Sequence, residues 1–508
     1  MEGSKWPKPI NTRRNTNVVE TKLDEEEPLT PTAQLFHAPQ FNCFIVAIVG
    51  FKTMINVDVI KEGLKHTLVK HPRFSSKLVL DHKKGGQPTG WIRTQVIVDD
   101  HVIIPALDPN IDSPDQLLED YVSNITKTPI DLSKPLWEIH LLNIKTKEAN
   151  SVAVFRVHHS VGDGISLMSL VLACTRQTAN PDALPTLPID PNKKKKMITS
   201  SKSSLPFLTC FLGLMLIFKL LWNTLVDLAM FTATALWLKD TKTPVKGGPD
   251  VGSTPKRYVY RTLSLDDIKQ VKKALDVTIN DVILGITQAG MSCYLNRKYG
   301  EIKRDGKDNK DNLPKHIRLR STILVNLRPT STIEDLANNM EASTKGQWNW
   351  GNAIGYVLFP FNIAIRNDPL DYIRNVKATM EKKKLSLEAI CTYKIARIVL
   401  KTLGLRVIAT LSHRVISHTT LAFSNIVGPK EEISFYGHPI AFLAPSVYGQ
   451  PQALTVHFQS YMDKMNLVLA IDQDVIPDPQ SLCDDIEESL RLANKAIIAQ
   501  NLSSSSLV

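Results

Sequence analysis

Residues 151–174 constrain the fold of this chain most, because they predict a strand, a tight turn and a helix in immediate succession. Residues 151–157 (SVAVFRV) are mostly β-branched and aromatic types typical of a strand. The motif HHSVGDG follows at residues 158–164, where Gly162 and Gly164 allow a tight turn and close approach of a ligand to the backbone. Residues 165–174 are apolar and are expected to form a helix.

The two histidines of this motif should point to opposite faces of the strand, because side chains alternate along a strand. His159 then shares a face with Phe155, and His158 shares the other face with Arg156. Histidine is the commonest general base near neutral pH, so the pattern indicates proton removal from an alcohol during acyl transfer. Asp163 could hold the loop through an arginine or fix the imidazole tautomer. The alternative is an ordinary strand and turn with a structural histidine pair.

The length of 508 residues exceeds what one hydrophobic core supports, so two large domains or more are expected. Six scattered cysteines form neither a CxxC motif nor a zinc spacing, which suits a reducing compartment. Two histidines binding a metal from one strand would be spaced H-x-H, and the adjacent pair argues against that. We therefore expect no metal and no redox cofactor.

The net charge of +11 favours an anionic partner, which could be a membrane surface, nucleic acid or the phosphates of CoA. No nucleic-acid-binding motif accompanies this charge, so we expect no nucleic-acid partner. The lysines Lys193–Lys196 precede a long apolar run and indicate contact with a membrane. The alternative is a solvated, charged linker.

The order of predicted elements indicates a mixed α/β chain with a central interruption. The first half carries an apolar strand in residues 41–51, a helix in 57–71 and a hairpin of strands in 136–142 and 151–159. The second half carries a helix in 263–275, another beginning at Thr278, and strands in 321–325, 424–429, 453–459 and 466–471. The expected divisions are a disordered N-terminus (1–22), a first domain (23–180), a linker (181–255), a second domain (256–500) and a loose tail (501–508).

The linker contains a hydrophobic segment at residues 205–238 that is interrupted by Lys219, Asn223 and Asp227. Its length makes it a candidate membrane helix, and the alternative is a long core helix. Basic residues flank it on both sides, so the positive-inside rule does not select an orientation. If both halves build one site they must share a side of the membrane. We therefore expect an interfacial or re-entrant helix, or a short hairpin, with both halves in the cytosol.

Several segments together resemble the plant-type wax ester synthase/diacylglycerol acyltransferase family. They are HHSVGDG at 158–164, PLWE at 135–138, Asn280-Asp281, NLRP at 326–329 and a C-terminal run from 424 to 490. The resemblance extends over nearly the whole chain from Glu25. HHxxxDG is shared with condensation domains of peptide synthetases, so the C-terminal run carries most of the specificity.

The resemblance implies two chloramphenicol-acetyltransferase-like α/β domains with an active-site tunnel between them, plus the membrane-associated helix. His159 would be the general base that deprotonates the acceptor hydroxyl, without an acyl-enzyme. His158, Asp163 and Gly164 would support the motif, with Arg328 as the partner of Asp163.

Residues outside this motif are expected to bind substrate. They are Asn280, Asp281, Asn326 and Arg328, although Asn280 and Asp281 also fit simple helix capping.

The implied substrates are fatty acyl-CoA and a long-chain alcohol, with diacylglycerol as a second acceptor and membrane lipid as a partner. Acyl-CoA is a substrate, so no cofactor is implied. The implied location is the endoplasmic reticulum membrane with the active site facing the cytosol, and the plasma membrane as a second location. The competing function is a catalytically weak lipid-transfer protein that uses the same tunnel. A soluble acyltransferase of secondary metabolism would need a DFGWG segment, which the sequence lacks.

Overall fold

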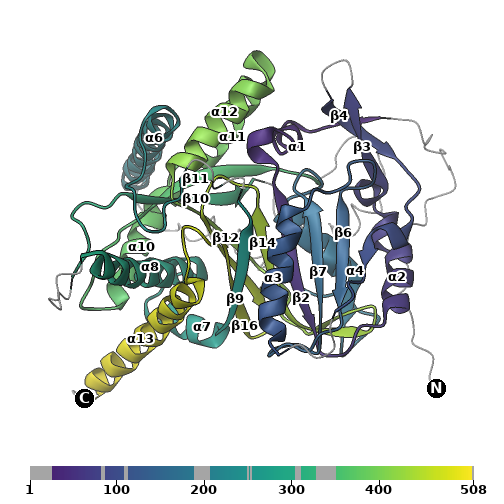
Figure 1. The fold of residues 1–508 in the computed structure, drawn as a ribbon. Helices are drawn as coiled ribbons and strands as arrows, with labels where there is room; N and C mark the ends of the chain where they lie inside the picture. Colours follow the sequence, from purple (N-terminus) through teal and green to yellow (C-terminus); the bar gives the residue numbers. More distant parts are fainter. Residues whose placement is uncertain are drawn as a thin grey trace.

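The computed structural model describes residues 26–81, 86–107, 112–187, 206–248, 251, 254–303, 311–327 and 350–505. The predicted disordered N-terminus, the cluster Lys193–Lys196 and Arg328 lie outside these residues. The described chain is a mixed α/β fold, as the sequence predicts, with two large sheets side by side (Figure 1).

The first large sheet takes most of its strands from the first half of the chain. In spatial order it contains β5 (Val102–Ile103), β6 (Trp137–Leu142), β7 (Ser151–His158), β2 (Phe44–Phe51), β14 (His438–Tyr448), β13 (Ile433–Phe435) and β8 (Thr175–Gln177). β6 and β7 pair antiparallel, which confirms the predicted hairpin. A small separate sheet contains β1 (Glu27–Pro28), β4 (Gln87–Arg93) and β3 (Ser76–Asp81).

The second large sheet comes entirely from the second half. Its order is β11 (Ile354–Phe361), β10 (Leu319–Asn326), β12 (Leu421–Ile426), β15 (Leu454–Tyr461), β16 (Lys464–Asp472) and β9 (Lys256–Ser264). β10, β12 and β15 are parallel neighbours. The sequence predicts a helix from residue 263, but β9 continues to Ser264, whose hydroxyl caps the following helix by accepting from the Asp267 amide at 3.1 Å.

β14 joins the two sheets, because it follows the second-half strand β12 in sequence but pairs with β2 in the first sheet. The side-chain amide of Asn466 on β16 donates to the Leu443 carbonyl of β14 at 2.8 Å. The hydroxyl of Tyr461 on β15 donates to the Ile440 carbonyl at 3.0 Å. A segment of the expected second domain thus completes the first sheet, which holds the two sheets together.

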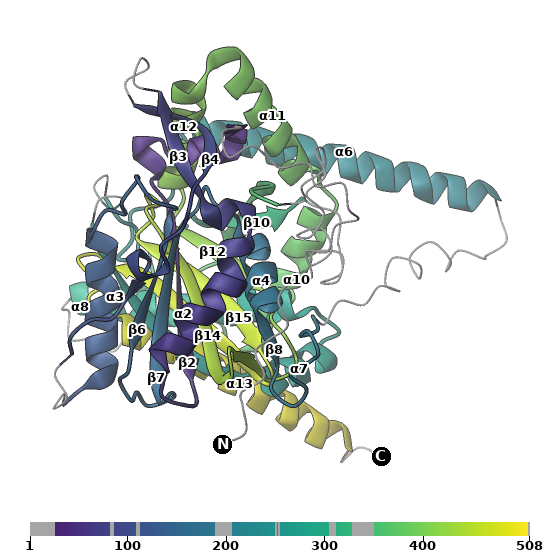
Figure 2. The same ribbon diagram turned by 90° about the vertical axis from the view of Figure 1, so that its right-hand side faces the viewer.

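The helices divide into three groups (Figures 1 and 2). With the first sheet are α2 (Val57–His66), α3 (Pro114–Lys127) and α4 (Gly164–Cys174), and α3 also packs on β9 of the second sheet. With the second are α7 (Leu265–Ala274), α8 (Ile279–Lys303), α10 (Leu370–Lys384) and α13 (Pro479–Ser505). Beyond the edge strand β11 lie α6 (Pro206–Leu236), α11 (Glu388–Leu403) and α12 (Leu405–His418). The short helix α1 (Pro31–Leu35) contacts α12. Short 3₁₀ turns occupy Pro39–Phe41, Leu68–Lys70, Pro72–Ser75 and Val98–Asp100.

Helices α8 and α13 pack side by side against the second sheet, where Gly290 permits their close approach. A Cβ at Gly290 would lie 2.6 Å from Cγ1 of Ile486 on α13. α13 continues to Ser505, so the tail at 501–508, which is expected from the sequence to be loose, begins as helix. The predicted helix at 57–71 is shorter than expected, since α2 ends at His66. Two 3₁₀ turns follow it, at Leu68–Lys70 and Pro72–Ser75.

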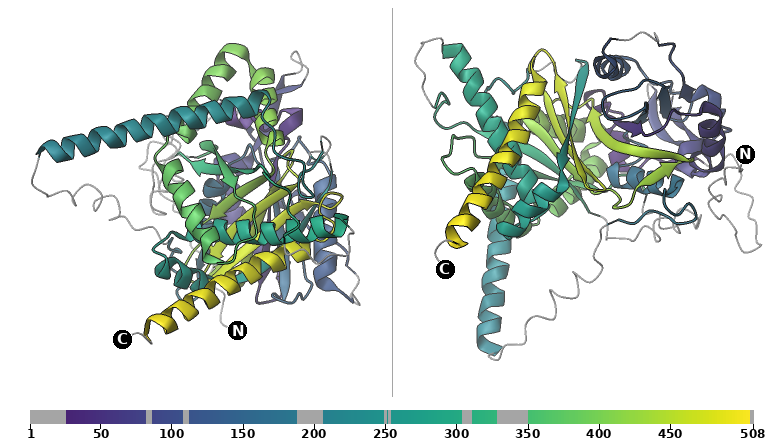
Figure 3. Two further views of the ribbon diagram at one scale, coloured as in Figure 1. Left: turned by 90° about the vertical axis from the view of Figure 1, so that its left-hand side faces the viewer. Right: turned by 90° about the horizontal axis from the view of Figure 1, so that it is seen from below.

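Helix α6 projects from the body of the protein (Figures 2 and 3). Residues Leu212–Leu236 are long and apolar enough to cross a membrane, and in the most apolar window only 6% of residues are buried. The alternative of a core helix is therefore wrong for this segment, because most of its apolar side chains are exposed.

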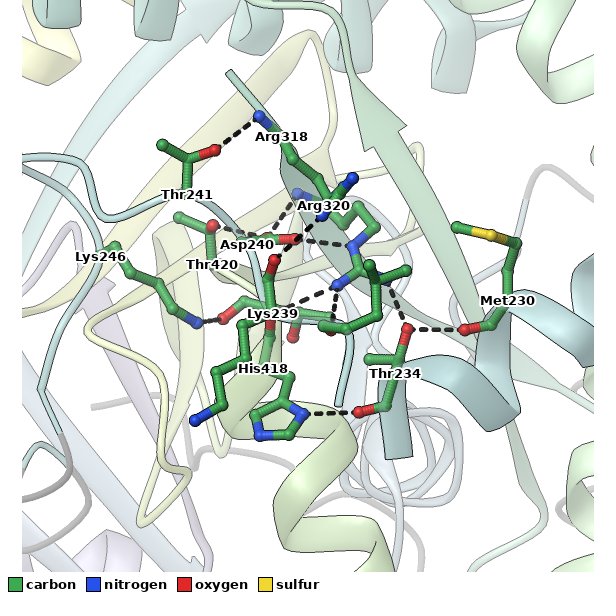
Figure 4. A network of polar contacts seen from close by, with 12 residues as sticks. Met230, Thr234, Lys239, Asp240, Thr241, Lys246, Arg318, Arg320, His418 and Thr420 are labelled. Carbon is green, nitrogen blue, oxygen red and sulfur yellow. Dashed lines mark hydrogen bonds and ion pairs between the residues drawn. The ribbon is translucent and has the colours of Figure 1, made fainter. Parts of the chain in front are cut away.

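A buried polar network fixes the C-terminal end of α6 to the second sheet (Figure 4). Arg320 of β10 donates from Nε to Oδ1 of Asp240 at 2.6 Å and from its backbone amide to Oδ2 at 2.7 Å. The same guanidinium donates to the Thr234 hydroxyl of α6 and to the Leu238 carbonyl. The Thr420 hydroxyl donates to Asp240 at 2.7 Å, which joins the end of α12 to the network.

Candidate active site

His159 lies immediately after β7, where the first sheet faces the second. Its backbone amide donates to the Cys43 carbonyl at 2.9 Å, and the Asn352 side chain donates to its own carbonyl at 2.9 Å. Phe36 stacks on the imidazole with a centroid distance of 4.2 Å. Nδ1 is enclosed in the protein, whereas Nε2 is not among the enclosed side-chain atoms that lack a partner. Nε2 is therefore the ring nitrogen that can meet a substrate.

The imidazole of His159 lines a cavity of about 150 Å³ between the two sheets, which we call the catalytic cavity. Both halves of the chain build it. Its polar lining consists of His159, Asp163, Asn326, Ser424, Asn425, Ser446 and His457. The remaining lining is mostly apolar and includes Phe155, which shares the strand face with His159 as the sequence predicts. Such a cavity admits an apolar chain and places its polar end beside a histidine.

His158 points the other way, which agrees with the predicted alternation of side chains. Its Nδ1 lies 2.7 Å from the Ser160 hydroxyl, and its Nε2 lies 3.2 Å from Oδ1 of Asn42. Its ring stacks on His37 at 4.2 Å between centroids. His158 does not line the catalytic cavity. Both of its nitrogens have protein partners, so this residue fixes the end of the strand.

Asp163 is the N-cap of α4 and also holds a second-half segment against the motif. Its Oδ1 accepts from the Ser166 amide at 3.0 Å, and its Oδ2 accepts from the Ala353 amide at 3.2 Å. The Asp163 amide donates to the Gly351 carbonyl at 3.2 Å. Arg328, the expected partner of Asp163, lies outside the described residues. The carboxylate thus accepts from a second-half backbone amide, that of Ala353, and the Asp163 backbone is bound to the same segment through Gly351.

Gly164 lets the two sheets approach each other at the catalytic cavity. A Cβ at this position would lie 2.6 Å from Cδ1 of Ile426 on β12. A larger residue would have to displace the end of the Ile426 side chain. The glycine of the motif thus permits close packing between the halves.

Burial keeps the imidazole of His159 neutral. Desolvation lowers its pKa below the ordinary value of 6.5, and the nearby Asp163 carboxylate opposes this shift. A neutral imidazole has a nitrogen lone pair that can accept a proton. The environment therefore suits a general base at physiological pH.

Of the other residues predicted to bind substrate, Asn326 at the end of β10 lines the catalytic cavity, and Asn280 and Asp281 do not. Asp281 makes a capping box, because its Oδ2 accepts from the Thr278 amide at 2.8 Å and its amide donates to the Thr278 hydroxyl at 3.2 Å. Asn280 accepts from the side chain of Asn425, a cavity residue, at 2.6 Å. The capping interpretation of Asp281 is confirmed, and Asn280 reaches the cavity through Asn425.

His457 also lines the catalytic cavity, and no sequence motif indicates it. It lies on β15, and neither ring nitrogen has a hydrogen-bond partner among the described residues. Burial lowers the pKa of its imidazole to about 4, so it is neutral. The nearby Ser446 hydroxyl of β14 is also buried without a described partner. A buried polar group without a partner has a cost of about 1–3 kcal/mol, which a bound polar group would relieve.

An α/β fold of two sheets, with a neutral histidine at the junction and apolar space around it, defines an enzyme of the acyltransferase class. Two family models match the chain: the wax ester synthase/diacylglycerol acyltransferase catalytic domain over residues 48–283 and the WS/DGAT C-terminal domain over residues 350–493. The chain belongs to the wax ester synthase/diacylglycerol acyltransferase family. It is an acyl-CoA-dependent O-acyltransferase.

Relatives in Arabidopsis thaliana match over most of the chain. Wax ester synthase/diacylglycerol acyltransferase 5 is 52% identical, with 94% of this chain and 96% of the relative covered. Wax ester synthase/diacylglycerol acyltransferase 4 is 50% identical, with 93% and 91% covered.

Two solved structures share the fold. The wax ester synthase/diacylglycerol acyltransferase from Marinobacter aquaeolei VT8 has a TM-score of 0.58 at 18% identity, covering 92% of this chain and 99% of that one. The first condensation domain of the CDA synthetase has a TM-score of 0.55 at 13% identity, covering 94% and 97%. At these identities the likeness concerns the fold alone. It confirms the expected mixed α/β fold.

Proposed function

We propose that His159 is the general base of the acyl transfer and that the acceptor is a long-chain alcohol or diacylglycerol. The observation that supports this most is the position of a neutral, buried imidazole in a cavity built by both halves. Nε2 takes the proton of the acceptor hydroxyl as its oxygen attacks the thioester carbonyl carbon. The C–S bond then breaks, and the CoA sulfur takes the proton from the imidazolium. The products are an ester and free CoA.

An apolar cavity of about 100 Å³ continues from the catalytic cavity between the first sheet and α4, and we call it the sheet cavity. The two cavities share Ala47, Phe155, Leu167, Met168, Val171 and Pro445. Beyond the shared wall, Val49, Ala153 and Leu170 line the sheet cavity. This space suits the hydrocarbon chain of the acyl donor, with its thioester beside His159.

We also propose that α6 lies on or in the endoplasmic reticulum membrane, with both halves on the cytosolic side. Asn223 binds Leu385, just after α10, and Asp227 pairs with Lys383 in the last turn of α10, so the C-terminal half of α6 is held against the protein. That half would have to leave the protein to cross a bilayer. Protease protection of tags at the two chain ends tests this, and protection of one tag alone would contradict it.

The proposed chemistry is tested with labelled palmitoyl-CoA and either hexadecanol or diacylglycerol, using membrane fractions that hold wild type, His159→Ala or His66→Ala. His66 is an exposed histidine on α2 and serves as the matched control. We expect a loss of about 10²–10⁴-fold for His159→Ala, as for removal of a general base, and none for His66→Ala. Normal activity in a well-expressed His159→Ala protein would make His159 structural. The favoured acceptor identifies the main product.

A further inference from the structure

Helix α6 turns Asn223, Thr224 and Asp227 toward the protein, whereas most of its apolar side chains, like Lys219, are exposed. The Asn223 side chain donates to the Leu385 carbonyl at 3.0 Å, and Asp227 pairs with Lys383 at 2.7 Å. Thr224 accepts from the Leu387 amide at 3.0 Å. Leu225, on the outer side, is 62% exposed. A helix of a water-soluble protein has the opposite arrangement, so the outer face of α6 suits an apolar medium.

The neighbouring α11–α12 hairpin presents a similar surface with added positive charge. Ile398 and Leu403 are 60% and 61% exposed. Residues 389–430, which include both helices after the first residue of α11, contain no aspartate or glutamate. Exposed basic side chains on this hairpin are Lys394, Arg397, Lys401, Arg406 and Arg414. Apolar side chains mixed with unopposed basic ones match the interface of an anionic bilayer.

A cavity of about 350 Å³ lies between α6, α11 and α12, and we call it the hairpin cavity. Its walls are mainly apolar and include Phe231 of α6, Leu400 of α11 and Val415 of α12. The three helices contact one another and lie together on one side of the molecule (Figures 1 and 2). The hairpin cavity is therefore bordered by the same helices whose outer faces suit a bilayer.

The hairpin cavity adjoins the catalytic cavity, because Ile354 of β11 lines both. Leu35 of α1 lines the hairpin cavity, and the next residue, Phe36, stacks on the imidazole of His159. The inner end of the hairpin cavity is thus close to the base. The sheet cavity lies on another side of the catalytic cavity and shares no lining residue with the hairpin cavity.

We propose that the hairpin cavity binds the hydrocarbon chain of the acceptor and that α6 with the α11–α12 hairpin is the membrane surface through which it enters. The reaction joins two long chains, and the described residues enclose two separate apolar cavities that each adjoin the catalytic cavity. A long-chain alcohol or diacylglycerol dissolves in the bilayer, whereas acyl-CoA carries a polar, phosphorylated head. The cavity walled by the apolar helices α6, α11 and α12 therefore takes the acceptor. This inference rests on the proposed function of the catalytic cavity.

The test fills the hairpin cavity from two facing helices with Ala396→Trp on α11 and Ser412→Trp on α12. Both residues line the cavity. The assay measures acylation of hexadecanol in vesicles and of water-soluble butanol by the full-length protein with palmitoyl-CoA. We expect each variant to lower the ratio of hexadecanol to butanol turnover about tenfold, because only the long chain needs the cavity.

Thr402→Trp is the matched control, because Thr402 is exposed on α11 and does not line the cavity. It should leave the ratio unchanged. An unchanged ratio in both cavity variants would overturn the proposal. An absence of acylation of both alcohols by the wild type would instead count against the proposed chemistry, so the two failures can be told apart.

Photocrosslinking of the wild-type protein with a diazirine-bearing hexadecanol does not depend on any variant folding. We expect labelled peptides from α6, α11 and α12, and less label when unmodified hexadecanol competes. Label confined to peptides of β7 and α4, which line the sheet cavity, would overturn the assignment of the acceptor chain.

Binding to vesicles tests the membrane surface. The combined variant Lys401→Gln/Arg406→Gln should sediment less with vesicles of phosphatidylcholine and phosphatidylserine than the wild type does, and salt should reduce the difference. Equal sedimentation of both proteins with these vesicles would overturn the role of the hairpin.

Discussion

His159 and His457 line one cavity although they lie on different sheets and 298 positions apart in the sequence. His159 follows β7 in the first sheet, and His457 is on β15 in the second. Both imidazoles are neutral, because burial lowers their pKa values. His159 is placed to accept a proton, and His457 is available to donate a hydrogen bond to a substrate oxygen.

Replacement of His457 by phenylalanine keeps a ring of similar shape and removes the hydrogen-bond donor. We expect kcat to fall about 10–10³-fold, as for loss of one donor to a developing negative charge. KM for acyl-CoA should change less, because the interaction strengthens as charge develops on the carbonyl oxygen. Steady-state kinetics with palmitoyl-CoA and hexadecanol measure both constants. An unchanged kcat would show that the ring only fills space.

The pH profile of acyl transfer should reflect the lowered pKa of His159. Below this pKa the imidazole is protonated and cannot accept the acceptor proton, so kcat/KM should fall as the pH decreases. Above it the base is neutral, so the rate should be flat through neutral pH. The acid limb should therefore lie below the ordinary histidine value of 6.5. Removing the carboxylate with Asp163→Asn should move that limb to lower pH, because Asp163 raises the pKa of His159. A limb above 6.5 would contradict the desolvated environment.

The buried pair of Arg320 and Asp240 should be a large contributor to the stability of the α6 attachment. Their side chains are 4% and 0% exposed. Arg320→Met leaves the Asp240 carboxylate buried without its cation, so we expect a loss of about 3–5 kcal/mol in the free energy of unfolding. Arg318→Met changes a neighbouring exposed arginine and should have little effect. Chemical denaturation of the purified variants measures both values, and equal losses would contradict the expected role of the pair.

The local parts of this molecule could be predicted from the sequence, and the parts made by distant contacts could not. Strand alternation placed His159 and His158 on opposite faces, and the spacing of Thr278 and Asp281 predicted a capping box, because both patterns depend on neighbouring residues. The insertion of β14 beside β2 depends on pairing between residues hundreds of positions apart. For the same reason His457 showed no signal, since only the packing of β15 against the first sheet brings it to the cavity.

Acid should destabilise the fold because several histidines are buried in their neutral form. Burial lowers the pKa of His37 and of His457 to about 4 and that of His71 to about 3. The unfolded chain takes up protons near the ordinary value of 6.5, whereas the folded chain takes them up only at lower pH. The unfolded state therefore binds more protons in this window, and stability is lost as the pH falls from about 6.5 to about 4, by about 1.4 kcal/mol per unit for each such group. Denaturation at a series of pH values should show a shallower slope for His457→Gln than for wild type, and identical slopes would contradict this origin of the acid sensitivity.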